Sequence, residues 1–295
     1  MSVLSTVRFD IDVLARSSIV HREDYTEAGT DTFALFRREK IVAPDGTDLL
    51  IPIVSGSSFR GVLRRIGEEL TAAVLNYEGT LPIPAAHLLT NGGRLGKSAN
   101  PLTDEQERHL KDLIPQIAVF GGSASGRIMS GLTIVGKVLP EIDELTHLLP
   151  RPPRGPTRPA ALLVDNEFYA HLSDHRPDLG QRRRADTTTG TKKTSPLGRF
   201  EVETLPAGTR LQTHVRITDA TDHQLGFLAQ VLTVFAERGH IGGRSAAGHG
   251  QIHATIAIKI DRGPQRNLTE LNEIDWATPL SQRRDKAIDA LRALT

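Results

Sequence analysis

A glycine-rich segment near the end of the chain has the composition of an anion-binding loop. Residues 239–250 contain five glycines, two histidines and one arginine, and they contain no acidic residue. Successive backbone N–H groups in such a segment can surround a phosphate, and glycine lets the backbone approach a ligand closely. A flexible turn between a helix and a strand explains the same composition, so the segment alone favours neither interpretation. Its candidate binding residues are Gly242, Gly243, Arg244 and His249.

A second candidate site lies at the predicted N-terminus of a long helix. Serines are good N-cap residues, and Ser57 and Ser58 precede apolar residues that recur at helical spacing as far as residue 75. The free N–H groups and the positive dipole end of a helix N-terminus can hold a phosphate. Arg60 and Arg64 are one turn apart and extend such a site. Simple capping beside a solvated basic face is the alternative, and for this helix alone it is slightly favoured.

Positive charge gathers in residues 176–199, although the formal net charge of the whole chain is only +1. The middle of this segment, 187–191, has no apolar residue, so it cannot pack into a core and we expect it to order on a partner. A protruding hairpin that contacts nucleic acid is favoured over a solvated loop without a function. The candidate contacts are Arg182, Arg183, Lys192 and Lys193.

The composition excludes several classes of function. The chain has 295 residues, of which 38% are hydrophobic and none is cysteine. Disulfides, thiolate zinc sites and a cysteine nucleophile are therefore excluded, and a reducing cytoplasm is the expected location. No run of residues approaches a membrane span, and we expect no metal and no cofactor. Aromatic residues make up only 4% of the chain, so we expect any bound RNA to be held by its backbone more than by base stacking.

The pattern of elements predicts an α+β fold. Apolar residues alternate in the strand-like segments and recur at helical spacing in the helical ones. Their order is β-α-β-β-α-β, which is typical of a ferredoxin-like (RRM-like) fold. We therefore expect residues 1–295 to form a single RRM-like domain. The predicted strands and helices are 7–14, 57–75, 132–139, the hairpin 200–205 with 211–217, 222–238, and 252–260.

Large insertions separate these elements. Residues 17–53 are predicted to form an inserted hairpin, with a turn at 44–46. Residues 76–116 form an irregular, finger-like insertion, and a polar helix is predicted from Thr103 to Phe120 that Pro115 ends or kinks. The basic segment 176–199 is the third insertion.

Four segments of the chain resemble the RAMP superfamily, the RNA-binding proteins of CRISPR systems. Residues 51–64 resemble its serine-rich helix N-terminus, 200–209 its hairpin before the second helix, and 239–250 its C-terminal glycine-rich loop. The run 120–127 matches a loop common in its backbone subunits. The resemblance is closest to the Cas-seven-type backbone subunit of type IV or type III systems, and it leans to type IV.

This resemblance implies a right-hand-shaped protein that binds guide RNA (crRNA). The ferredoxin-like core is then the palm, 76–116 the fingers and the basic hairpin 176–199 the thumb. Copies stack head-to-tail along the guide and form an open helical filament. Other CRISPR effector subunits join this assembly, and no membrane takes part in it. The target nucleic acid is recognised by base pairing with the guide, so the subunit itself is not expected to be an enzyme.

The same resemblance also implies two enzymatic alternatives. A type III-like backbone subunit would cut target RNA with an aspartate after the first strand, where this chain has Asp24 and Asp31, with His21 as a base. A crRNA-processing endoribonuclease would use a histidine near the glycine-rich loop, where His240 and His249 stand. Surface carboxylates and loop histidines are the simpler explanation. The residues before Asp24 also lack the glycine-rich sequence that tends to precede this aspartate in type III subunits.

Overall fold

The central element of the fold is a five-stranded antiparallel sheet built around the first strand. The computed structural model describes residues 4–23, 33–77, 79–98, 100–172 and 197–294. The strand order is β12-β1-β11-β7, and β8 also pairs with β11. All four pairings are antiparallel. The strands are β1 (Ser5–Ala15), β7 (Thr133–Val135), β8 (Leu139–Pro140), β11 (Arg210–Ala220) and β12 (Ile252–Arg262).

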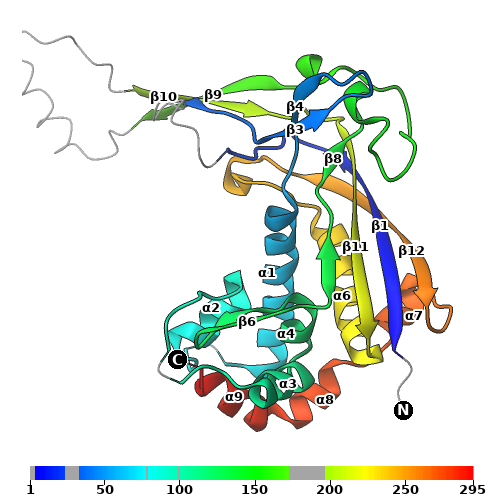
Figure 1. The fold of residues 1–295 in the computed structure, drawn as a ribbon. Helices are drawn as coiled ribbons and strands as arrows, with labels where there is room; N and C mark the ends of the chain where they lie inside the picture. The colour runs from blue at the N-terminus through cyan, green and yellow to red at the C-terminus, as the bar shows by residue number, and fades with distance from the viewer. Residues whose placement is uncertain (1–3, 24–32, 78, 99, 173–196, 295) are drawn as a thin grey trace, which may run out of the picture.

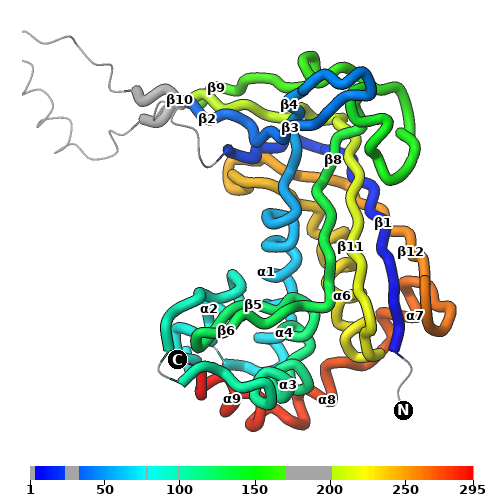
Figure 2. Tube along the Cα trace, in the orientation of Figure 1, coloured from blue at the N-terminus to red at the C-terminus, as the bar shows by residue number. Residues whose placement is uncertain are grey.

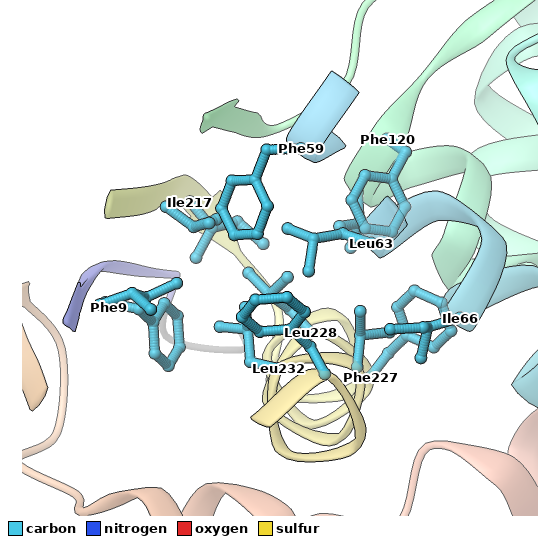
Figure 3. Packing of buried hydrophobic residues seen from close by; sticks show 14 of the residues in the cluster. Phe9, Phe59, Leu63, Ile66, Phe120, Ile217, Phe227, Leu228 and Leu232 are labelled. Atoms are coloured by element: carbon cyan, nitrogen blue, oxygen red, sulfur yellow. The ribbon is translucent and has the colours of Figure 1, made fainter. Parts of the chain in front are cut away.

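Two long helices cover one face of this sheet. Phe9, Ile11 and Val13 alternate along β1 and are fully buried, because successive side chains of a strand point to opposite faces. Helices α1 (Gly56–Leu75) and α6 (Asp222–Arg238) pack on them. The rings of Phe59 and Phe235 join the two helices edge to face, with centroids 5.2 Å apart. Figure 3 shows the apolar side chains that meet between the sheet and these helices.

The opposite face of the sheet is polar and carries a bound proline-rich segment. Asp10 and Asp12 of β1 point to this face. Arg151 forms ion pairs with both, at 2.9 and 2.5 Å. Arg154 pairs with the buried carboxylate of Glu141 at 2.8 Å. These bonds fasten the proline-rich segment 150–159, so it occupies part of a face that would otherwise be open to a ligand.

A helical lobe surrounds the C-terminal half of α1 (Figure 1). The sequence pattern predicts a helix over 103–120 that Pro115 ends or kinks, and the structure has two helices there, α3 and α4, which are separated at Ile114. The C-terminal helix α9 packs on α3. The elements of the lobe are α2 (Ile83–Asn91), α3 (Asp104–Leu113), α4 (Pro115–Phe120), β5 (Gly122–Ala124), β6 (Arg127–Met129), α8 (Ala277–Gln282) and α9 (Arg284–Arg292). The short helix α7 (Leu268–Asn272) packs on α6 instead.

A second group of strands lies at the other end of α1, as the trace in Figure 2 shows. A three-stranded sheet has the order β2-β10-β9, and β3 forms a hairpin with β4. Strands β9 and β10 are antiparallel, and their pairing runs from Asp165 opposite Thr204 to Leu172 opposite Leu197. The elements are β2 (Phe33–Ala34), β3 (Arg38–Val42), β4 (Asp48–Pro52), β9 (Asp165–Leu172) and β10 (Leu197–Thr204), with short 3-10 helices at Asp143–Leu145 (η1) and Ala160–Leu162 (η2).

The structure confirms a mixed α+β fold with antiparallel sheets. The predicted strand 132–139 is interrupted, because the chain leaves the sheet between β7 and β8 and pairs there with Val54. Residues 17–53 contain the hairpin β3–β4, and 76–116 contain α2 and α3. The basic segment 176–199 lies outside the described residues except for its last three. Among the described residues, no helix is long and apolar enough to cross a membrane.

Candidate nucleic-acid interface

The N-terminus of α1 presents hydroxyl groups and no acid. Ser55 is the N-cap, and its Oγ accepts a hydrogen bond from the Ser58 amide at 3.2 Å. The Ser55 and Ser57 hydroxyls lie 3.1 Å apart, and Ser57 is exposed. The first turn contains no acidic residue, so the positive end of the helix dipole has no carboxylate beside it. Ser57 can therefore face an anionic ligand.

Arg60 and Arg64 do not extend this site as the sequence pattern predicted. Arg64 is only 7% exposed, and its guanidinium donates to the carbonyls of Phe120 and Gly121, each at 2.8 Å. Arg60 donates to the carbonyls of Phe120 and Thr133. Burial, together with the charge of Arg60, lowers the pKa of Arg64 to about 10. Both arginines bind the carbonyl end of α4, where a cation is favoured, and Arg64 lies inside the protein.

His21 is also bound to the start of α1. Its Nε2 accepts a hydrogen bond from the Ser55 amide at 3.1 Å, and its ring packs edge-on against Phe36. An Nε2 atom that accepts this bond carries no proton, and its lone pair is already used. The predicted base function of His21 is therefore not available at Nε2 in this arrangement. Asp24 and Asp31 lie outside the described residues.

The glycine-rich loop is held by backbone hydrogen bonds to the segment that follows β1. The Gly243 amide donates to the Val20 carbonyl and the Gly250 amide to the Ser18 carbonyl, both at 2.8 Å. A Cβ atom on Gly242 would lie 2.4 Å from the Val20 carbonyl oxygen, and φ at Gly242 is +82°. Gly242 therefore allows two backbones to pack closely, and the Gly243 amide is bound within the protein and not presented to a phosphate.

The tip of this loop is exposed and carries one cation. Residues 243–248 are exposed, and a short 3-10 helix, η4 (Ser245–Ala247), closes the turn. Arg244 has φ of +57°, which is uncommon for a residue with a side chain. Its guanidinium carbon lies over the ring of Tyr169 on β9, 4.9 Å from the ring centroid. The loop thus holds its arginine at the surface, against an aromatic face.

His249 is buried beneath this tip and joins three segments. It is 3% exposed, and its Nδ1 lies 2.9 Å from the Ser18 hydroxyl. Its ring packs edge-on against Tyr169, with centroids 5.5 Å apart, and its Nε2 is 4.0 Å from a carboxylate oxygen of Glu167. His240 donates from Nε2 to the His249 carbonyl at 2.8 Å. Because its ring is enclosed, His249 is not exposed to a ligand as the sequence pattern predicted; it packs beneath the exposed tip of the loop.

The start of α1 and the glycine-rich loop are both hydrogen-bonded to the same short segment, which follows β1. Val20 pairs with Gly243, and the next residue, His21, accepts from Ser55. One extended segment therefore holds both predicted sites at the same end of α1. Strand β9, which supplies Glu167 and Tyr169 on the other side of the loop, is a neighbour that the sequence pattern did not indicate.

The other predicted contacts are not placed by the structure. Arg182, Arg183, Lys192 and Lys193 lie outside the described residues, although β9 and β10, which lead to and from them, end side by side at Leu172 and Leu197. In the part of the chain that the structure describes, no group of three or more His, Asp or Glu side chains could hold a metal ion.

Comparisons with known proteins identify the family. The sequence model of the RAMP superfamily matches residues 31–253. A solved structure described as "Type IV-B CRISPR Complex" contains a chain with 50% sequence identity and a TM-score of 0.61, and the match covers 90% of this chain and 98% of that one. The comparison with curated proteins gave no match. The family match includes both the start of α1 and the glycine-rich loop, and it extends over most of the sequence: the chain belongs to the RAMP superfamily.

Proposed function

We propose that this protein is a guide-RNA-binding backbone subunit of a CRISPR effector complex of the type IV-B kind. The observation that carries the proposal is the 50% identity to a chain of a "Type IV-B CRISPR Complex", over 98% of that chain. Several copies bind head-to-tail along the guide RNA in the cytoplasm, together with other effector subunits. The guide then recognises the target nucleic acid by base pairing.

The five-stranded sheet and its two helices form the ferredoxin-like palm in this proposal. The strand order β12-β1-β11-β7 supports it, because β1, β7, β11 and β12 are the four strands of a β-α-β-β-α-β unit, with α1 and α6 between them. Residues 76–116 are the proposed fingers, and the basic segment 176–199 is the proposed thumb. The inserted hairpin β3–β4 of the 17–53 segment stands beside the β9–β10 ribbon.

The proposed RNA-binding surface is the end of the palm where α1 begins. Ser57 is exposed at the start of α1 and Arg244 at the tip of the glycine-rich loop. The ribbon β9–β10, which leads to the basic segment, contacts the loop through Tyr169. A hydroxyl at a helix N-terminus, an exposed cation and a cluster of basic residues are the groups that bind a phosphate backbone. The proline-rich segment fastened to the polar face of the sheet makes that face the less suitable surface.

The proposal is tested by measuring how the full chain binds a single-stranded guide RNA at several salt concentrations. We expect tight binding that weakens with salt, and we expect replacement of Arg182, Arg183, Lys192 and Lys193 by Ala to weaken it. The slope of log affinity against log salt falls by about 0.7 for each phosphate contact that is lost. The matched control replaces four exposed cations elsewhere, namely Arg108, Lys259, Lys286 and Arg292. A wild-type chain that does not bind the RNA would contradict the proposed function.

A further inference from the structure

Arg244 combines three features that leave its guanidinium available to a ligand beside an aromatic ring. Its guanidinium lies over an aromatic ring, 4.9 Å from the centroid. The residue is exposed, so the Tyr169 ring does not enclose its side chain. Among the described residues, no carboxylate lies within ion-pair distance of Arg244, whereas Arg38 on the nearby hairpin is bound by Glu203 at 2.8 Å.

The Arg244–Tyr169 pair is held in place from below. The Tyr169 ring packs against the edge of His249, and His249 is buried and bound to the Ser18 hydroxyl at 2.9 Å. The backbone of Arg244 is fixed in the left-handed region, and its carbonyl accepts a hydrogen bond from the Ala247 amide at 3.0 Å. A group that is ordered before its ligand arrives loses less conformational entropy on binding. The Tyr169 ring and the backbone of Arg244 are therefore positioned before a ligand binds.

The chemistry of this surface favours a flat ligand over a phosphate alone. The Gly243 and Gly248 amides donate to carbonyls of the protein, so these two N–H groups do not surround an anion beside the arginine. A guanidinium plane stacks on a nucleobase, and proteins that recognise unstacked bases use Arg planes and aromatic rings for this purpose.

We propose that Arg244, seated on Tyr169, stacks on an unpaired nucleobase of the bound RNA. The inference rests on the proposed function and deepens it, because it assigns a base contact to a chain that has few aromatic residues. Tyr169 is the positioning residue: it covers the inner face of the guanidinium and leaves the outer face for the base. The RNA is held here through a base as well as through its phosphates.

Two RNAs of equal length separate stacking from charge: an oligoadenylate, and a strand of the same backbone that lacks its bases. We expect the wild-type full chain to bind the oligoadenylate more tightly, by about 5- to 100-fold for a stacked base. Arg244→Lys keeps the charge but has no flat face. We therefore expect it to lose that preference, while its affinity for the abasic strand and its salt slope stay as in the wild type. Arg108→Lys, at an exposed arginine of α3, is the matched control and leaves both affinities unchanged.

Two substitutions at Tyr169 test the platform itself. The buried Tyr169 hydroxyl has no hydrogen-bond partner among the described residues, so Tyr169→Phe keeps the ring and retains the base preference. Tyr169→Leu removes the ring and lowers the preference as Arg244→Lys does, with thermal unfolding measured to show that the variant is folded. Wild-type preference in Arg244→Lys would leave a phosphate contact only and overturn the inference. Failure of the wild type to bind either RNA would instead overturn the proposed function.

Discussion

Two arginines that the sequence pattern predicts as binding residues lie in different environments. Arg64 is buried and donates to backbone carbonyls at the end of α4. Arg244 is exposed and rests on the ring of Tyr169. A buried guanidinium is stable only where its donors are used, and Arg64 meets that condition through the carbonyls of Phe120 and Gly121. The same group at the surface keeps its donors and one face for a ligand.

We expect Arg64→Leu to destabilise the protein without changing its contact with RNA. The substitution leaves the Gly121 carbonyl without its donor, at a cost of about 1–3 kcal/mol, whereas the Phe120 carbonyl still accepts a hydrogen bond from Arg60. The measurement is the free energy of unfolding in urea. Arg65→Leu, at the exposed neighbouring position, is the control and changes stability by about 0.5 kcal/mol or less. Equal stability of the two variants would show that Arg64 has no structural function.

At the scale of elements, the glycine-rich loop is a connection whose glycines have different functions. Gly239 ends α6 in the left-handed conformation, which glycine adopts without strain. Gly242 and Gly250 lie against carbonyl oxygens, so a side chain there has no space. Gly248 also has a positive φ, but nothing lies within 4 Å of its Cβ position. In this loop Gly248 is required for its backbone angle alone, whereas Gly239, Gly242 and Gly250 also lie too close to a carbonyl oxygen to carry a side chain.

This difference predicts unequal effects for two alanine substitutions. Gly248→Ala only places a side chain in the left-handed region, which costs about 1–2 kcal/mol. Gly250→Ala also brings Cβ to 2.1 Å from the Ile241 carbonyl oxygen, so the loop must move. We expect Gly250→Ala to lower the melting temperature further and to reduce RNA affinity, while Gly248→Ala binds RNA nearly as the wild type does. The interpretation fails if the two variants behave alike in thermal unfolding and RNA titration.

The main elements could be predicted from the sequence because their patterns are local. The alternation of Phe9, Ile11 and Val13 identifies β1, and the helical spacing from Phe59 to Leu75 identifies α1 with nearly correct bounds. The helix predicted over 103–120 is divided at Pro115, where it is expected to end or kink, because Ile114 adopts an extended conformation before the proline. The helical backbone conformation is disfavoured for a residue that precedes a proline.

The site was less predictable because its contacts join distant residues. Nothing near Arg64 in the sequence shows that the carbonyls of residues 120 and 121 will receive its guanidinium. Tyr169 belongs to no motif that the sequence shows, and its contact with Arg244 depends on how β9 lies against the loop. The residue type of His249 marks it as a candidate, but its hydrogen bond joins it to Ser18, 231 residues away in the sequence. Residue types in the glycine-rich loop indicated the chemistry, whereas the fold decides which side chains are exposed.

At the scale of the whole molecule, the exposed candidate groups gather at one end. The start of α1, the glycine-rich loop and the ends of the β9–β10 ribbon lie at the same end of α1, and the helical lobe lies at the other (Figure 1). The polar face of the sheet carries the proline-rich segment 150–159, held through Arg151 and Arg154. An RNA bound at the first end therefore leaves the lobe and the sheet edges for protein contacts. This arrangement suits a subunit that binds a neighbouring copy while it binds RNA.

A head-to-tail contact between copies predicts how the assembly depends on RNA length. A contact between two different surfaces of the same chain does not close unless its rotation completes a ring, so copies can be added without limit along a strand. We expect native mass spectrometry of the full chain, 32.2 kDa per copy, to show one more bound copy for each fixed increase in the length of a single-stranded RNA. Single-stranded DNA of equal lengths is the control for the sugar. A number of copies that stays constant while the RNA grows would indicate a closed assembly, and it would contradict the filament while leaving RNA binding by the single subunit intact.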